Sequence, residues 1–242
     1  MLEKLALIPF LISSTTQSLN EANVAGINHH ELIPQEQIIL NAEVTSGIDY
    51  SRVFKVEHFD ENGNNLVDIQ ILSPFIHQVD DLEEGTLASI GVTACGPTSL
   101  TMALNQRGGN YKLNEVIDAL PGYVYQKQVG FYQLNKGPET FGLKGVEIDW
   151  TTESLYSTLE NGYPVIMNIQ GYEGSIGHAI LVLGLKGYNP QTKNAQALIA
   201  HDPYGGPYRE FKYLGERSLL QPEGYTNTIG TKKPFYIVGD EI

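Results

Sequence analysis

The sequence predicts an α+β protein in which a β-rich leader is followed by helices and then by a mostly antiparallel sheet. Three observations support this fold class. Residues 53–72 contain two strand-like segments, residues 97–162 carry apolar side chains at helical spacing, and residues 163–200 contain three apolar runs of strand length. With 242 residues, 41% of them hydrophobic, the chain is long enough to bury one substantial core.

The leader ends in a predicted hairpin. VFKVEHF (residues 53–59) and LVDIQIL (residues 66–72) alternate as strands do, and the DENGNN segment between them has the composition of a turn. Acidic and amide residues alternate in this turn as they do in a calcium-binding loop, but Ile71 stands where a bidentate acid is required. We therefore expect a plain hairpin turn.

The first residues leave two interpretations open. Leu5 to Ile12 form a short apolar run after Lys4, which is similar to a signal peptide, although Pro9 interrupts the run. The other interpretation is an N-terminal strand or helix that packs on the body of the protein.

Three helices are predicted next. PTSLTMALNQ starts with Pro97, a residue suited to the first helical position, and the helix stops at the following Gly-Gly pair. LNEVIDAL is a second, short helix, and TTESLYSTLENG begins with hydroxyl caps and closes on Gly162. The runs VIMNI, AILVLGL and ALIA then predict the central strands of the sheet.

The net charge of the chain restricts the classes of partner that it is expected to bind. Its 15 basic and 28 acidic residues leave a formal charge of −13. This charge argues against nonspecific nucleic-acid binding and against binding to an anionic membrane surface. No stretch approaches the roughly 20 apolar residues of a membrane-spanning helix, and the histidines lack the spacing of a metal site on one helix face. We expect no nucleic acid, membrane span, cofactor or metal.

Cys95 is the only cysteine and stands directly before the Gly-Pro step that opens the first helix. A cysteine at a helix N-terminus faces unpaired backbone N–H groups and the positive end of the helix dipole, and both favour the thiolate. Taken alone, Cys95 is either a buried structural residue or a reactive nucleophile.

His178 and Asp202 are candidate partners of this thiol. His178 opens the apolar strand GHAILVLG, and Asp202 ends the next strand in HDPYGG. A carboxylate that accepts one ring N–H of a histidine stabilises the imidazolium form. His201 is the rival histidine, but adjacent strand residues face opposite sides, so His201 and Asp202 do not both point into one site.

Together these segments show a family resemblance. ACGPTSLTMAL, GHAILVLG and HDPYGG resemble the three motifs of the C39-like peptidase family, a bacterial and phage branch of papain-like proteins, and the similarity covers roughly residues 72–215. It implies a papain-like fold with an N-terminal helix packed on an antiparallel β-sheet. It divides the chain into a peptidase domain, residues 71–242, and an N-terminal extension, residues 1–70, which resembles no family.

The resemblance also implies functional residues. Cys95, His178 and Asp202 match the triad of the family, and SPFIHQVDD matches an upstream segment that nominates Gln78 as a side-chain donor to an oxyanion hole. The segment between Gln78 and Cys95 is longer than the family has. It is either a lid or substrate loop, or an insertion that displaces Gln78.

Two functions from different classes follow. The first is a thiol-dependent hydrolase that cleaves an amide bond in a peptide or in a peptidoglycan cross-link, in a secreted, cell-envelope or phage-encoded protein. The second is an inactive papain-like scaffold used for binding. The sequence does not determine the oligomeric state.

Overall fold

The computed structural model describes residues 53–86, 88–172, 177–215 and 217–239. These residues lie in one compact unit. The predicted features of residues 1–12 lie outside the described residues, and the division of the chain between residues 70 and 71 stays a prediction.

The centre of the fold is a closed barrel of six antiparallel strands. The strands are β6 (Val165–Gln170), β7 (His178–Tyr188), β8 (Ala197–Asp202), β9 (Gly206–Gly215), β10 (Ser218–Leu220) and β11 (Thr226–Ile229). Each strand pairs with the next, and β6 closes the ring because it pairs with both β11 and β7. Closure leaves none of the six without a neighbour on either side.

Further strands extend this sheet. The predicted hairpin is confirmed: β1 (Val53–Phe59) pairs with β2 (Asn65–Ile71), and β2 pairs with β7. Strands β12 (Phe235–Val238) and β5 (Lys144–Glu147) are added beside β6, and β3 (Tyr125–Gln126) and β4 (Gly130–Phe131) make a separate small ribbon. In the hairpin turn, the Asp60 carboxylate accepts backbone N–H bonds from Asn62 and Asn64, as in an ordinary Asx turn.

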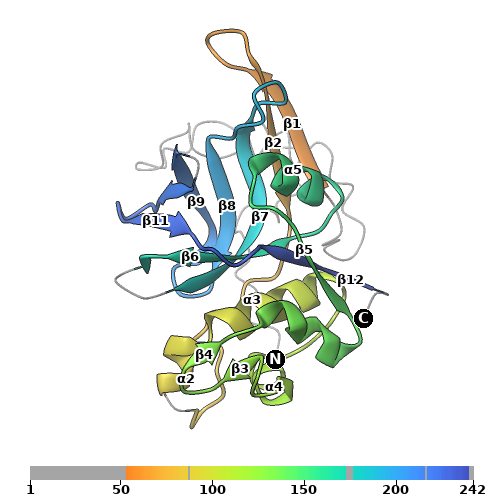
Figure 1. Cartoon of the computed structure of the whole chain (residues 1–242), viewed down its shortest axis with the longest axis vertical. Coiled ribbons are helices and arrows are strands. Elements are labelled where there is room, and N and C mark those ends of the chain that lie inside the picture. Colours follow the sequence, from red (N-terminus) through yellow and green to blue (C-terminus); the bar gives the residue numbers. More distant parts are fainter. Residues whose placement is uncertain (1–52, 87, 173–176, 216, 240–242) are drawn as a thin grey trace, which may run out of the picture. The chain divides into compact units, whose positions relative to one another are not determined.

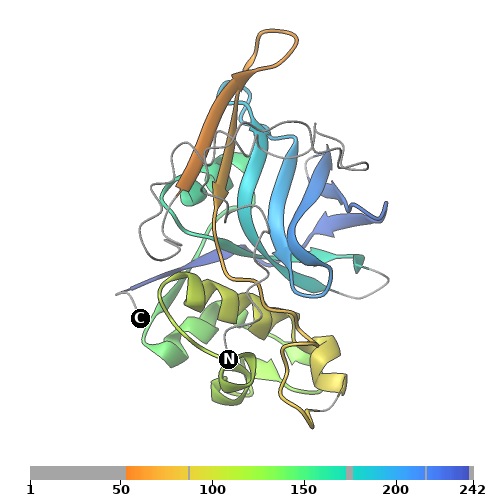
Figure 2. The same ribbon diagram turned by 180° about the vertical axis from the view of Figure 1, so that it is seen from behind.

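The helices lie mainly on one side of the barrel (Figures 1 and 2). They are α2 (Ala88–Thr93), α3 (Cys95–Gln106), α4 (Leu113–Ala119), the 3₁₀ helix η1 (Leu134–Phe141) and α5 (Thr152–Glu160). The three helices expected from the sequence correspond to α3, α4 and α5. As predicted, a hydroxyl caps the last of these: Thr151 Oγ1 accepts the N–H of Ser154 at 3.2 Å.

Strand β7 is buried on both faces. Ile180 and Val182 point into a core inside the barrel, whereas Leu181 and Leu183 belong to a second core that also contains Leu100 of α3. Alternate strand residues face opposite sides, so the unbroken apolar run AILVLGL is what a strand between two cores requires. This packing fixes α3 against the strand that begins at His178.

The predicted fold class, an α+β papain-like fold with an N-terminal helix on a sheet, is wrong. The structure is mostly β, with a closed six-stranded antiparallel barrel, additional strands and few helices. The fold class could not be predicted from the residues after 205. There β9, β10 and β11 are short or mix polar with apolar residues, so their sequences do not indicate strands. Barrel closure depends on pairing between β6 and β11, which are distant in sequence, and no local pattern encodes it.

Candidate active site

Cys95 is the first residue of α3. The backbone carbonyl of Ala94, which precedes the helix, accepts both the N–H and the hydroxyl of Thr98, each at 2.8 Å. These two bonds hold the first turn of a helix in which Gly96 and Pro97 follow the cysteine. The thiol is buried, with 6% of Cys95 exposed, and lies at the end of the helix where backbone N–H groups favour an anion.

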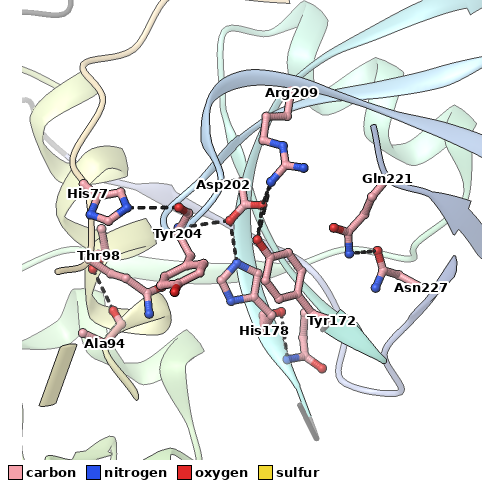
Figure 3. A network of polar contacts seen from close by, with 12 residues as sticks. His77, Ala94, Thr98, Tyr172, His178, Asp202, Tyr204, Arg209, Gln221 and Asn227 are labelled. Carbon is pink, nitrogen blue, oxygen red and sulfur yellow. Dashed lines mark hydrogen bonds and ion pairs between the residues drawn. The ribbon is translucent and has the colours of Figure 1, made fainter. Parts of the chain in front are cut away.

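His178 is held at the start of β7. It is opposite Ile169 in the ladder between β6 and β7, and its backbone carbonyl accepts a hydrogen bond from Asn168 Nδ2 at 3.3 Å. The imidazole stacks on the Tyr172 ring, with 4.0 Å between centroids and 26° between planes. Ring, backbone and strand register therefore all fix the direction of this side chain (Figure 3).

The structure brings Cys95, His178 and Asp202 together in one hydrogen-bonded chain. His178 Nε2 donates to Asp202 Oδ1 at 2.8 Å, and the His178 side chain is also hydrogen-bonded to the Cys95 side chain. The residues come from α3, β7 and β8, and all three side chains are buried.

The electrostatic environment of Cys95 and His178 favours a thiolate beside an imidazolium. Burial by itself raises the pKa of Cys95, but the hydrogen bond and charge of His178, with the backbone N–H groups of Ala179 and Gly96, outweigh burial and lower the pKa. For His178, burial favours the neutral ring, but the hydrogen bonds to Asp202 and Cys95 and their charges raise its pKa to about 9.

Asp202 is fully buried and ionised, and both of its carboxylate oxygens accept hydrogen bonds. Oδ1 accepts from His178 Nε2 and from Tyr204 N at 3.1 Å, while Oδ2 accepts from Tyr172 Oη at 2.8 Å and from Arg209 Nη1 at 2.7 Å (Figure 3). Burial raises the pKa of this carboxyl, but the His178 bond and charge and the other donors lower it to about 2. A carboxylate held in this way orients the imidazole without taking its proton.

Tyr172 and Arg209 are site residues that sequence reasoning missed. Tyr172 holds both the ring of His178 and the carboxylate of Asp202, and Arg209 also forms an ion pair with Glu223. The Gly-Gly pair of HDPYGG was a usable signal. A Cβ at Gly205 would lie 1.5 Å from Arg209 Nη1, so this position needs glycine to let the guanidinium approach Asp202.

His201 has a structural environment. Its Nε2–H donates to Ser73 O at 3.0 Å, and its Nδ1 accepts the N–H of Tyr208 at 3.1 Å. Burial lowers the pKa of His201 to about 4, and its bond to the Ser73 carbonyl only partly opposes this effect. With both ring nitrogens occupied and the ring neutral, His201 positions the chain around residue 73.

Gln78 lies beside the triad but is already hydrogen-bonded. Its backbone N–H donates to the carbonyl of Pro203, the residue after Asp202, at 2.8 Å. Its side-chain Nε2 donates to Gly91 O at 2.7 Å and to Val92 O at 3.4 Å, and its Oε1 is buried without a hydrogen-bond partner among the described residues. The extra residues between Gln78 and Cys95 thus include α2, to which the Gln78 amide is bonded. Its role as an oxyanion donor stays a prediction.

The described residues contain neither a metal-binding cluster nor a membrane-spanning helix. Among them, no three His, Cys, Asp or Glu side chains are grouped so that they could hold a metal ion. Within the same part of the chain, no helix has the length and apolar character needed to cross a membrane.

Comparison with known proteins identifies the family. The model of the Peptidase_C39 like family matches residues 71–219, which include the thiol, the imidazole and the carboxylate described above. The chain belongs to the Peptidase_C39 like family. This membership indicates a peptidase-type function. A comparison with curated proteins gives no match.

Proposed function

We propose that this member of the Peptidase_C39 like family is a cysteine peptidase that hydrolyses an amide bond through Cys95, His178 and Asp202. The observation that carries the proposal is the continuous chain of hydrogen bonds from thiol to imidazole to carboxylate. The shifts of pKa point the same way, because they favour an ionised thiol and a protonated ring near neutral pH.

In the proposed reaction the Cys95 thiolate attacks the carbonyl carbon of the substrate. The negative charge moves to the carbonyl oxygen, for which the Cys95 backbone N–H and the Gln78 side-chain amide are the candidate donors. The C–N bond then breaks, and the His178 imidazolium gives its proton to the leaving amine. A water molecule, deprotonated by neutral His178, hydrolyses the thioester and regenerates the enzyme.

Asp202 orients His178 in this reaction cycle. Its bond to Nε2 leaves Nδ1 as the nitrogen that faces the thiol, and its charge stabilises the imidazolium. Tyr172 and Arg209 are positioning residues in this scheme, because they act on Asp202 and His178.

The proposed substrate is a peptide. A peptidoglycan cross-link is the second amide substrate of this class, but a protein with a formal charge of −13 is less suited to anionic wall polymers. Hydrolysis of a quenched fluorescent peptide library and clearing of a suspension of purified sacculi separate the two substrates. Sacculi that clear while no peptide is cut would replace the peptide with the cross-link.

The test of the mechanism compares two histidines. His178→Gln and Cys95→Ala should each reduce peptide hydrolysis at least 1,000-fold, since nucleophile and base act as one unit. His58 is the matched control, because it forms a His–Asp pair with Asp68 at 3.2 Å in the β1–β2 hairpin. His58→Gln should keep at least half of the activity. Full activity in Cys95→Ala would refute the proposal and favour a binding role for the fold.

A further inference from the structure

A cavity of about 310 Å³ lies beside the start of β7. Its wall includes Ala179, whose backbone hydrogen-bonds the Cys95 side chain, and Asn168, whose side chain bonds the His178 carbonyl. Residues 132–136, which include the start of η1, the segment before β12 and residues of β5, β6 and β12 make up the rest of the wall. A substrate bound at Cys95 would therefore have this cavity within reach of the residues that flank its scissile bond.

The cavity is basic in an acidic protein. Three of the 15 basic residues of the chain, Lys136, Lys232 and Lys233, line it, and Glu147 is the acidic residue among the lining side chains. Asn135 Nδ2 donates to Glu147 Oε1 at 2.9 Å, so this carboxylate already has a neutral partner. Among the side chains that line the cavity, cations therefore outnumber anions, whereas in the chain as a whole anions outnumber cations.

The lysines are positioned so that a ligand can compete for them. Lys232 Nζ donates to the backbone carbonyl of Tyr132 at 2.7 Å, which holds its ammonium at the cavity. Lys136 pairs with Glu139 at 3.3 Å and Lys233 with Asp149 at 3.2 Å, and neither acid lines the cavity.

Both of these pairs are about half exposed or more. Exposed ion pairs contribute little stability, so a substrate carboxylate can replace either acid at little cost. The lysines are thus available to a ligand even though they have partners.

We infer that this cavity is a substrate subsite that takes a residue with a carboxylate side chain, close to the scissile bond. Leu134 and Phe235 supply apolar wall against which the methylene groups of a glutamate can pack, and the lysines supply donors for its carboxylate. The inference rests on the proposed peptidase function, and it adds the substrate class: peptides with glutamate or a similar acid next to the cut.

The test uses pairs of peptides that differ only by glutamate or glutamine at one position near the cut. For the full-length wild type, we expect kcat/KM for the glutamate peptide to exceed that for the glutamine peptide about tenfold. In Lys232→Gln/Lys233→Gln this ratio should fall below about twofold, and in Lys233→Glu it should invert. Lys193→Gln is the matched control. Lys193 lies in the turn after β7, at the opposite end of this strand from His178, and pairs with Glu153 of α5. In this variant the ratio should stay near ten.

The same peptides, added to Cys95→Ala protein and followed by calorimetry, separate the subsite from the chemistry. If no peptide is cut but the glutamate peptide binds about tenfold more tightly, the subsite stands and the proposed function fails. If peptides are cut with equal kcat/KM for glutamate and glutamine at every position tested, the peptidase stands and the subsite is overturned. A tenfold preference that survives in the double lysine variant would also overturn it.

Discussion

Replacement of His178 by alanine should make Cys95 an ordinary buried thiol, and the rate of its alkylation reports this change directly. Iodoacetamide reacts with the thiolate, so the rate follows the thiolate fraction and the access to the sulfur. At pH 6.5 we expect the wild-type protein to react at least tenfold faster than His178→Ala.

The magnitude follows from the histidine side of the pair. The pKa of His178 rises from 6.5 to about 9 in spite of burial, which corresponds to about 3 kcal/mol in favour of the imidazolium. Asp202 and the Cys95 thiolate supply this energy. The coupling is reciprocal, so the imidazolium stabilises the thiolate by the same free energy by which the thiolate stabilises the imidazolium. A tenfold change in thiolate fraction needs about 1.4 kcal/mol, less than half of the total.

The assay is the rate of alkylation between pH 5 and pH 10, followed by mass spectrometry of the intact protein. The shape of each curve separates thiolate fraction from access, because access scales the rate equally at every pH. His58→Ala, which disturbs the other His–Asp pair, should follow the wild-type curve. A wild-type curve that coincides with that of His178→Ala at every pH would refute the thiolate–imidazolium pair and with it the activation of Cys95.

Four further outcomes follow from the same structure. Asp202→Asn should lower kcat at least 100-fold and, because it leaves the buried Arg209 guanidinium without this carboxylate, lower the free energy of unfolding by about 3 kcal/mol in urea titrations. Tyr172→Phe keeps the ring over His178 but removes the hydroxyl from Asp202, so kcat should fall three- to tenfold with KM unchanged. Phe211→Ala, inside the barrel, should cost about 3–5 kcal/mol of stability by the same titration. The midpoint of thermal unfolding should be highest near pH 6.5 and fall on either side.

The sign of that pH dependence comes from three shifted groups, Asp202, His178 and His201. The folded-state pKa of His201 lies below 6.5, so its contribution is present above pH 6.5 and is lost as the pH falls through about 4. The folded-state pKa of Asp202 lies below its ordinary value of 3.8, so its contribution is present above pH 3.8 and is lost as the pH falls through about 2. The folded-state pKa of His178 lies above 6.5, so its contribution is complete below pH 6.5 and is lost as the pH rises through about 9. A midpoint that rises steadily from pH 6.5 to pH 9 would contradict this account. Glu139→Gln, at an exposed surface pair, is the control that should leave the profile unchanged.

Local patterns predicted much of what surrounds the candidate site. The Gly-Pro step and the apolar residues of PTSLTMALNQ mark the helix that begins at Cys95, and the unbroken run AILVLGL marks the strand that begins at His178. Period-2 alternation likewise predicted the β1–β2 hairpin. These features could be read because they depend on residues within one element, where side-chain size, capping and periodicity act over a few positions.

Only the tertiary structure decided the closed barrel and the environment of Asp202. Strand β11 reaches β6 across more than 50 residues, and its short, mixed sequence TNTI carries no local sign of that partner. Tyr172 and Arg209 meet at one carboxylate oxygen from separate segments. The sequence by itself determined the family and nominated Cys95, His178 and Asp202 as candidate catalytic residues. The pairing that closes the barrel sets their geometry, because ladder hydrogen bonds and buried contacts between distant segments leave no periodicity along the chain.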